Sequence, residues 1–387
     1  MKSMPTRRRR TPLVVATLSA FALMLAACGN GDDSDDPEPD EEAAEEAEGA
    51  EEPDPEPDPE AEPGDEVDVV EDGESLEINV SIFHPEGDPW TQIIQPFFDE
   101  VEERTAGRIT FNPFFAGSLA SVGDNLDSVA GGAIDMGLDL ASTSSRIAPE
   151  FTYFEALGSY PQDYADQWDA IYADLHPEFA AIMEREGVRL LVWGPGGSEL
   201  IFFNGGGDFL VEPEDFAGLT LRTAGTWQGQ QIDALGGSSI SMDPGELYLA
   251  LQTGTVDATP QAATLGLGAS LYEVAPNLSN ISLTFNTLLY VINPDVWDSL
   301  SAEDQRIFEE AAERASLAVP ATMQEQEQLA IEEMQSRDGV EFYRLTDDER
   351  QAIFDEIAPV LEEAADISRG TSDEGQRLID AIQSYID

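Results

Sequence analysis

Apolar and polar residues alternate strictly along Leu76–Ile82, which predicts a half-buried strand. After an Asp88-Pro89 start, apolar residues recur at helical spacing as far as Gly107 and predict one continuous helix. Shorter segments continue the pattern, with a strand at 109–111, a helix at 126–130 and a strand at 134–138. Strands that alternate with helices in this way form parallel sheets with right-handed crossovers. The first part of the folded chain is therefore predicted to be an α/β unit.

A second unit of the same kind is predicted between Gly218 and Asp257. Its helices end at glycines, where a left-handed exit from the helix costs least. The predicted elements are a strand at 220–223, a helix at 227–235, a strand at 240–242 and a helix that begins at Asp243-Pro244 and ends at Gly254. Arg222 stands near the end of the first of these strands. Its guanidinium is planar, permanently charged and matched to a carboxylate, although a surface position or a structural ion pair is the alternative.

Glycine-rich segments follow two apolar strands in the middle of the chain. Val188–Trp193 leads into Gly194–Gly197, and Ile201–Phe203 leads into Gly205–Gly207. Such segments provide the backbone freedom that hinges between two lobes need, and plain surface loops are the alternative. The remaining predicted elements are a strand at 285–293, a long helix capped by Ser301 and Asp304 and kinked at Pro320, and helices at 347–365 and 373–385.

Several motifs in these units resemble one family. In the second unit they are Gly218-Leu219-Thr220-Leu221-Arg222, then Ala234-Leu235-Gly236-Gly237, then the helix from Glu246 through Gly254 to Asp257. In the first unit they are Val101–Arg108 (VEERTAGR), Gly117-Ser118-Leu119 and Gly132–Met136 (GAIDM). In this order they resemble the solute-binding proteins of TRAP transporters, the DctP-type family, over about Leu76 to Ile382.

The resemblance implies a two-lobe α/β fold like that of periplasmic binding proteins, with mixed, mostly parallel sheets flanked by helices and a long C-terminal helix. Lobe I is expected at 75–195 with a return near 285–310, lobe II at 196–284, and C-terminal helices at 302–387 that span both. The implied function is capture of a small organic acid by cleft closure, with Arg222 holding the carboxylate. The implied partners are the TRAP membrane permease subunits, without ATP use by this chain.

Five further residues are candidate ligand contacts. His84 ends the first strand in a His-Pro turn similar to the family's, with an imidazole in solvent as the alternative, and Gln261 stands where the family has an Asn. Phe202 and Trp227 are candidates for the apolar wall, with core packing as the alternative, and Tyr290 offers a hydroxyl. Family members that bind sialic acid carry a second Arg near position 202, which this sequence lacks. We therefore expect a smaller carboxylate.

The N-terminus has the composition of a targeting segment. Residues 1–27 combine a basic start with an apolar run and end in Leu25-Ala26-Ala27-Cys28, which predicts a lipoprotein signal peptide with Cys28 as the lipidated residue. An ordinary signal peptide is the alternative. Residues 28–74 hold 24 acidic and no basic residues and are predicted to be a disordered tether, with an acidic, cation-binding tail as the alternative. The expected location is outside the cell membrane or in the periplasm, held by the lipid anchor only.

Charge and missing motifs exclude other classes of function. The formal net charge is −61, and no Lys follows Lys2, which argues against nucleic acid as a partner and indicates a salt-loving source. The only Cys is Cys28 and the only His residues are His84 and His176, so no zinc motif is present, and no P-loop or nucleophile elbow occurs. We expect that the chain is not an enzyme and that it binds no cofactor and no metal. A sensor lipoprotein that presents its ligand to a receptor and an ABC-type binding lipoprotein are the alternative functions.

Overall fold

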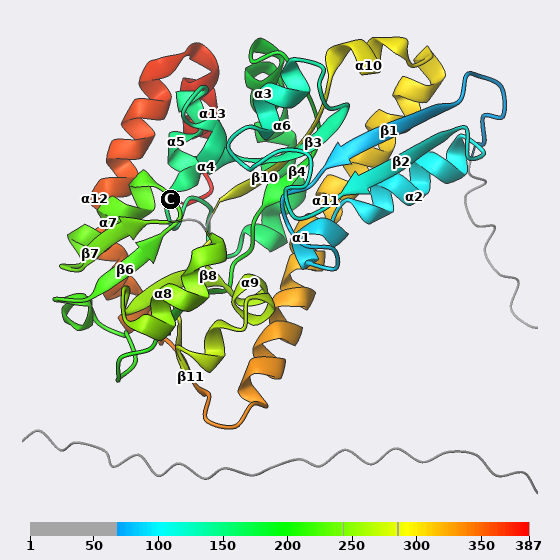
Figure 1. The fold of residues 1–387 in the computed structure, drawn as a ribbon. Helices are drawn as coiled ribbons and strands as arrows, with labels where there is room; N and C mark the ends of the chain where they lie inside the picture. The colour runs from blue at the N-terminus through cyan, green and yellow to red at the C-terminus, as the bar shows by residue number, and fades with distance from the viewer. Residues whose placement is uncertain (1–67, 243, 285, 387) are drawn as a thin grey trace, which may run out of the picture. The chain divides into compact units, whose positions relative to one another are not determined.

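The structure, a computed structural model, describes residues 68–242, 244–284 and 286–386. The predicted signal peptide, Cys28 and nearly all of the predicted tether lie outside these residues. Within the described part, two mixed sheets flanked by helices account for the fold (Figure 1). The predicted fold class is therefore confirmed.

The first sheet has the strand order β2-β1-β3-β10-β4. Its strands are β1 (Leu76–Ser81), β2 (Ile109–Phe114), β3 (Met136–Leu140), β4 (Arg189–Pro195) and β10 (Thr287–Ile292). β1 pairs in parallel with β2 and with β3, as the alternation of strands and helices predicts. β10 pairs antiparallel with β3 and β4 and comes from much later in the chain. β3 begins two residues later than the predicted strand at 134–138.

The second sheet has the strand order β11-β9-β5-β8-β6-β7. Its strands are β5 (Leu200–Asn204), β6 (Thr220–Thr223), β7 (Ser238–Ser241), β8 (Ala258–Ala262), β9 (Asn277–Asn280) and β11 (Glu341–Arg344). β6 is parallel to β7 and β8, whereas β5 is antiparallel to β8 and β9. The helices on this sheet include α7 (Thr226–Ala234), α8 (Leu247–Thr253) and α9 (Ala263–Gly268). Gly236 and Gly254 both adopt positive φ, as expected for the residues that end α7 and α8.

The helix predicted from Asp88 to Gly107 is two helices, α1 (Pro89–Gln92) and α2 (Gln95–Arg104). Pro96 explains the break, because proline lacks the N–H that an interior helical residue donates and its ring clashes with the carbonyl four residues earlier, here that of Gln92. The Asp88 side chain accepts a hydrogen bond from Trp90 N at 2.8 Å and caps the first of these helices. The prediction of one continuous helix is wrong for this reason.

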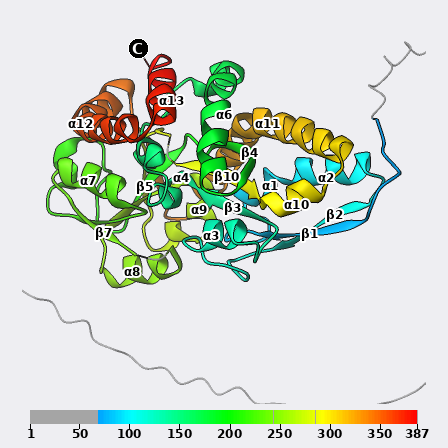
Figure 2. The same ribbon diagram turned by 90° about the horizontal axis from the view of Figure 1, so that it is seen from above.

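Two strand connections and the long helix α11 (Ala302–Gln335) join the sheets. The chain crosses between β4 and β5 and returns between β9 and β10, and Gly196 N donates to Asn286 O at 3.3 Å where the crossings meet. α11 contacts α2 and β4 beside the first sheet and α9 beside the second (Figure 2). It starts at Ser301, whose side chain caps it, and it continues as one helix through Pro320.

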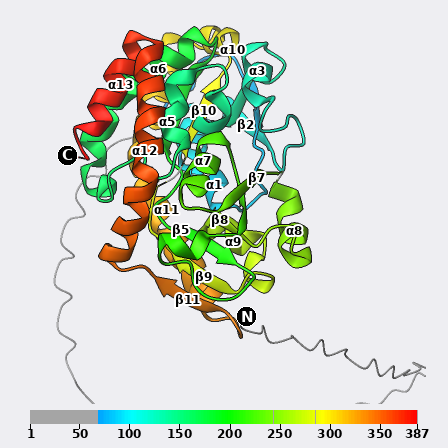
Figure 3. The same cartoon turned by 90° about the vertical axis from the view of Figure 1, so that its left-hand side faces the viewer.

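The C-terminal helices cover the side where the two sheets approach each other. α12 (Asp347–Thr371) contacts α5 (Thr152–Glu155) and α7, and α13 (Asp373–Gln383) packs against α6 (Trp168–Arg185) (Figure 3). The sequence predictions omit α6, although its buried residues Ile171, Leu175, Phe179 and Ile182 follow helical spacing. Further short helices are α3 (Asn125–Ala130), α4 (Ala141–Ser144) and α10 (Pro294–Ser299). These helices flank the two sheets.

Candidate ligand-binding cavity

A cavity of about 1110 Å³ lies where the ends of strands from both sheets face each other. From the first sheet it is lined by the segment after β1 (83–90) and the segment after β3 (140–143). From the second sheet it is lined by Arg222 of β6, the residues after β7, and the β8–α9 corner. β1, β3, β6 and β7 all present their carboxyl ends here, which is where ligands bind in sheets of this type. α11 closes one side with Gln326, Leu329, Ala330 and Glu333.

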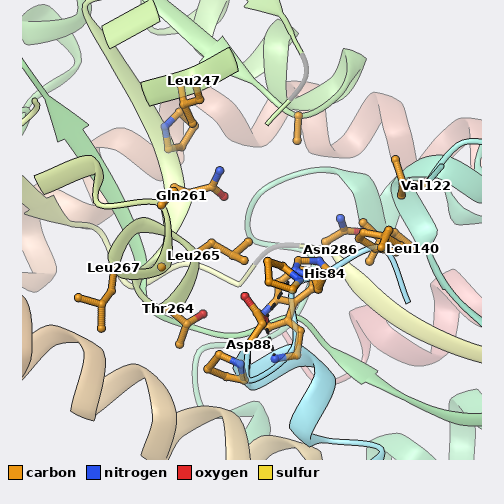
Figure 4. A pocket seen from close by; sticks show the side chains of 18 of the residues that line it. His84, Asp88, Val122, Leu140, Leu247, Gln261, Thr264, Leu265, Leu267 and Asn286 are labelled. Carbon is orange, nitrogen blue, oxygen red and sulfur yellow. Dashed lines mark hydrogen bonds and ion pairs between the residues drawn. The ribbon is translucent and has the colours of Figure 1, made fainter. Parts of the chain in front are cut away.

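Aromatic rings and a carboxylate form the wall that follows β1. The ring of His84 lies 4.6 Å from that of Phe83 and 4.8 Å from that of Trp90, measured between centroids. His84 Nδ1 is 3.6 Å from Asp88 Oδ1, the same oxygen that caps α1. The Asp88 carboxylate thus caps the helix and lies beside the imidazole. Figure 4 shows His84 and Asp88 next to each other in this wall.

Arg222 supplies positive charge from the opposite wall. Only 4% of the residue is exposed. Its Nε and Nη2 donate to the carbonyl of Met242 at 3.2 and 3.1 Å, and its own carbonyl accepts a hydrogen bond from Thr259 Oγ1 at 3.2 Å. A guanidinium in such a site is oriented by the backbone and poorly hydrated, two properties that strengthen its attraction for a carboxylate.

Glu155 connects the first sheet's side of the cavity to α7. Its carboxylate accepts hydrogen bonds from Trp227 N at 2.9 Å and from the Ser145 hydroxyl at 3.2 Å. Burial raises the pKa of this carboxyl, and the hydrogen bonds oppose the shift. A second bridge lies beside it, where Gln231 of α7 accepts from Leu157 N at 2.8 Å and donates to Leu157 O at 3.1 Å. The segment after α5 is therefore tied to α7 by direct hydrogen bonds.

Three of the six predicted ligand contacts line this cavity together. They are Arg222, His84 and Gln261, which come from β6, the segment after β1, and β8. Gln261 lies across the cavity from His84 (Figure 4). The structure thus brings into one cavity residues that are up to 177 positions apart in the chain.

The other three predicted contacts lie elsewhere. Phe202 is fully buried and packs edge-on against Phe216 with ring centroids 5.0 Å apart, so it belongs to the core. Tyr290 is also fully buried, and its hydroxyl donates to Trp90 O at 3.1 Å. Trp227 packs against a hydrophobic cluster, and its backbone amide is the group that meets Glu155. None of the three is among the residues that line the cavity.

Several lining residues carry no signal that sequence reasoning could have used. Glu155 is one of many acidic residues, and Thr264 follows an unremarkable Ala-Ala pair. Asn286 has a φ of 56°, and its amide both accepts from Ser142 N and donates to Ser142 Oγ. Asn tolerates this left-handed conformation better than most residues, but the sequence alone does not reveal where it is required. Only the fold brings these side chains to the cavity.

The described residues contain neither a metal-binding cluster nor a membrane-spanning helix. No group of three or more His, Cys, Asp or Glu side chains within 68–242, 244–284 and 286–386 has an arrangement that could hold a metal ion. In the same ranges, every helix is too short or too polar to cross a bilayer.

Most of the chain matches the model of one protein family. The model of the family described as bacterial extracellular solute-binding protein, family 7 (DctP), matches residues 80–366. This range includes both sheets except for the first four residues of β1, and every part of the cavity wall.

Curated relatives of the chain have names that refer to different solutes. The ectoine-binding periplasmic protein TeaA of Halomonas elongata is 26% identical over 307 residues, which cover 77% of this chain and 86% of the relative. The C4-dicarboxylate-binding periplasmic protein DctP of Rhodobacter capsulatus is 24% identical over 275 residues, which cover 70% of this chain and 80% of the relative.

Solved structures share the fold. The periplasmic ectoine-binding protein of the TeaABC TRAP transporter of Halomonas elongata superposes with a TM-score of 0.71 at 23% identity, covering 80% of this chain and 99% of that structure. A TRAP periplasmic solute-binding protein from a Sulfitobacter species, with bound β-D-galacturonate, has a TM-score of 0.68 at 20% identity and covers the same shares of the two chains. At these identities the likeness shows the fold.

Proposed function

Because the chain belongs to the DctP family of bacterial extracellular solute-binding proteins, we propose that its cavity captures a small organic acid for a TRAP-type membrane permease. The observation that carries this proposal is the buried guanidinium of Arg222, held at the end of β6 in a cavity that both sheets line. The family consists of binding proteins, which agrees with the expectation that the chain is not an enzyme. The match also favours a TRAP-type over an ABC-type transporter.

Arg222 is the group we assign to the ligand carboxylate. A net charge of −61 repels anions at long range, so an acid needs a strong local attraction to bind. Charge-assisted hydrogen bonds contribute about 1.5–3 kcal/mol each, and the low exposure of Arg222 reduces screening by salt. The aromatic wall at His84 and Trp90 then covers the remainder of the ligand.

The sheets with their helices act as the two lobes in this proposal. Lobe I is 75–195 with a return near 285–310, lobe II is 196–284, and 302–387 spans both. The return of β10 to the first sheet and the contacts of α11 with both sides support this division. Closure over a ligand shifts an equilibrium between two lobe arrangements, and a shift from mostly open to mostly closed needs about 5 kcal/mol of differential binding. Contacts from both walls to one ligand supply that difference.

Substitution of Arg222 by Lys tests the carboxylate assignment. Lysine keeps the charge but cannot offer paired donors, so affinity should fall by at least tenfold while the protein still folds. Isothermal titration calorimetry with the tightest binder from a thermal-shift panel of uronates, C4-dicarboxylates and ectoine gives the measurement. Arg146→Lys is the matched control, because the Arg146 side chain is 62% exposed and does not line the cavity. Equal affinity of Arg222→Lys and wild type would contradict the assignment.

The proposal includes a lipid anchor that holds the protein at the membrane. The Leu25-Ala26-Ala27-Cys28 sequence supports lipidation of Cys28 after signal-peptide cleavage, with the acidic segment 28–74 as the tether to the binding domain. Replacement of Cys28 by Ala should release the protein from the membrane fraction of producing cells. Retention of the variant in that fraction would contradict the anchor.

A further inference from the structure

The corner between β8 and α9 presents a second polar position to the cavity. Thr264, the second residue of α9, lines the cavity and is only 4% exposed. Its hydroxyl Oγ1 is buried and has no hydrogen-bond partner among the residues that the structure describes. Gln261 of β8 lies on the same side of the cavity (Figure 4).

A buried hydroxyl without a partner destabilises the fold. Leaving such a group unsatisfied costs about 1–3 kcal/mol, which is why most buried polar groups in proteins are paired. Threonine in the first turn of a helix usually bonds to the neighbouring backbone or caps the helix, and Thr264 does neither in the described structure. Valine has nearly the same shape and no hydroxyl, so packing alone does not require threonine here.

Close packing holds α9 in the place from which Thr264 reaches the cavity. Gly266, two residues further on, lies so close to β5 that a Cβ added there would be 1.9 Å from Phe203 Cζ. α9 also packs against α11, whose residues line an adjoining part of the cavity. The Thr264 position is therefore fixed by the fold on two sides.

The strand register places Gln261 at a defined offset from Arg222. Leu221 of β6 is paired with Ala258 of β8, so the next residues, Arg222 and Thr259, project from the other face of the sheet. Gln261 is two residues beyond Thr259 and projects from that same face, about 7 Å further along the strand. Thr264 follows at the turn into α9. If a ligand's carboxylate is held at Arg222 and its remainder is several bonds long, the far end of the ligand reaches this corner.

We propose that Thr264 and Gln261 form a polar subsite that selects carboxylic acids carrying a neutral hydroxyl or carbonyl oxygen several bonds away from the carboxylate. The Thr264 hydroxyl and the Gln261 amide can each donate to and accept from such an oxygen. A purely aliphatic acid of the same size leaves the Thr264 hydroxyl unpaired, as it is without ligand, and so gains no affinity from it. The inference rests on the proposed binding of an organic acid at Arg222.

Thr264→Val tests the subsite by separating binding from stability. The probes are d-glucuronate, a six-membered ring acid with hydroxyls, and cyclohexanecarboxylate, a six-membered ring acid without them. Calorimetry should show wild type binding d-glucuronate more tightly than cyclohexanecarboxylate. Thr264→Val should weaken d-glucuronate binding roughly fivefold to tenfold, the equivalent of one hydrogen bond, and leave cyclohexanecarboxylate binding unchanged. Without ligand, its melting temperature should equal or exceed that of wild type, because no protein hydrogen bond is lost.

Thr105→Val is the matched control. Thr105 is fully buried, its hydroxyl donates to Val101 O at 2.7 Å, and it does not line the cavity. This variant should have a lower melting temperature and wild-type affinity for d-glucuronate. A structural role for the Thr264 hydroxyl predicts a similar loss of stability in Thr264→Val.

The outcomes distinguish this inference from the proposed function. The subsite is refuted if wild type prefers cyclohexanecarboxylate, or if it binds neither probe but binds succinate. It is also refuted if Thr264→Val binds d-glucuronate as tightly as wild type or loses stability as Thr105→Val does. The proposed function fails separately, when no acid binds wild type or when Arg222→Lys binds as tightly as wild type.

Discussion

At the scale of single residues, Glu327 is a buried acid at the place where the chain crosses between the sheets. Its carboxyl oxygens accept hydrogen bonds from Ser198 N at 3.1 and 3.2 Å and from Glu199 N at 3.1 Å. A Cβ added at Gly197, which has a φ of 128°, would lie 2.1 Å from Glu327 Oε1, so glycine is required there. Burial raises the pKa of Glu327 to about 8, and the nearby Glu199 adds to the shift.

This raised pKa predicts a loss of stability as pH increases. The unfolded chain releases the Glu327 proton near the usual pKa of 4.5, whereas the folded protein keeps it until about pH 8. The folded state therefore binds more protons between these values, and the contribution of Glu327 to stability is complete below pH 4.5 and declines as pH rises through 8. The melting temperature of wild type relative to Glu327→Gln should fall by several degrees from pH 5 to pH 9.

The exposed Glu325 of the same helix provides the control for the change in charge. Differential scanning calorimetry of Glu325→Gln should show a constant offset from wild type across the same pH range. A constant offset for Glu327→Gln as well would mean that Glu327 is not protonated in the folded protein near neutral pH.

Residue chemistry alone could predict some of the cavity and not the rest. Arg222 could be predicted because a charged fork at the end of a short strand stands inside a long motif. Phe202 and Tyr290 could not be distinguished from wall residues, since an apolar strand does not reveal which of its faces meets the core and which the cavity. Thr264 and Glu155 depend on contacts between segments far apart in the chain, which no local pattern encodes.

At the scale of elements, α9 shows how one close contact positions a wall of the cavity. Gly266 allows this helix to approach Phe203 of β5, which it could not do with any side chain at that position. Gly268 is in the same helix, and a Cβ added there would have no neighbour within 4 Å. A side chain therefore fits at position 268 but not at position 266, and the sequence alone does not reveal this difference.

Alanine substitutions at these glycines should have opposite effects on stability. Gly266→Ala should lower the free energy of unfolding by about 1–3 kcal/mol or more, because α9 or Phe203 must move. Gly268→Ala should leave it unchanged or raise it by up to about 1 kcal/mol, because alanine restricts the unfolded chain. Urea unfolding monitored by circular dichroism gives both values. Equal effects of the two substitutions would show that α9 is not held by its contact with Phe203.

Element types were more predictable than their limits. Alternation and glycine stops were sufficient for β1, β6, α7 and α8, because these elements have local signals at both ends. The apolar spacing continues through Pro96 and so hides the break at Ile93–Ile94, which the proline causes. β8, β9 and β11 were not predicted, since their pairing partners come from distant parts of the chain.

At the scale of the whole molecule, the main feature is the excess of acidic over basic residues. The chain has 79 acidic residues against 18 Lys and Arg. Arg side chains form ion pairs at many points of the described surface, such as Arg377 with Glu178 at 2.7 Å, but they are too few to neutralise the acidic groups. Repulsion between the remaining carboxylates destabilises the compact state. We propose that the protein is adapted to high salt, where this repulsion is screened.

Salt should therefore stabilise the protein strongly. The Debye length falls from about 10 Å at 0.1 M to about 3 Å at 1 M, so most repulsion between separate surface carboxylates disappears over this range. The melting temperature should rise steeply between 0.1 and 1 M NaCl and more slowly above 1 M. KCl should give the same curve, since screening does not depend on the cation's identity. A melting temperature that is flat or falls with added salt would contradict the proposed adaptation.

The most direct test of the central claim is a crystal structure of the wild-type protein with an acid from the thermal-shift panel bound. We predict that the ligand lies in the cavity between the two sheets, with a carboxylate oxygen about 2.7–2.9 Å from a guanidinium nitrogen of Arg222. A ligand bound outside this cavity, or one inside it whose carboxylate is held by other residues while Arg222 contacts only protein, would contradict the account.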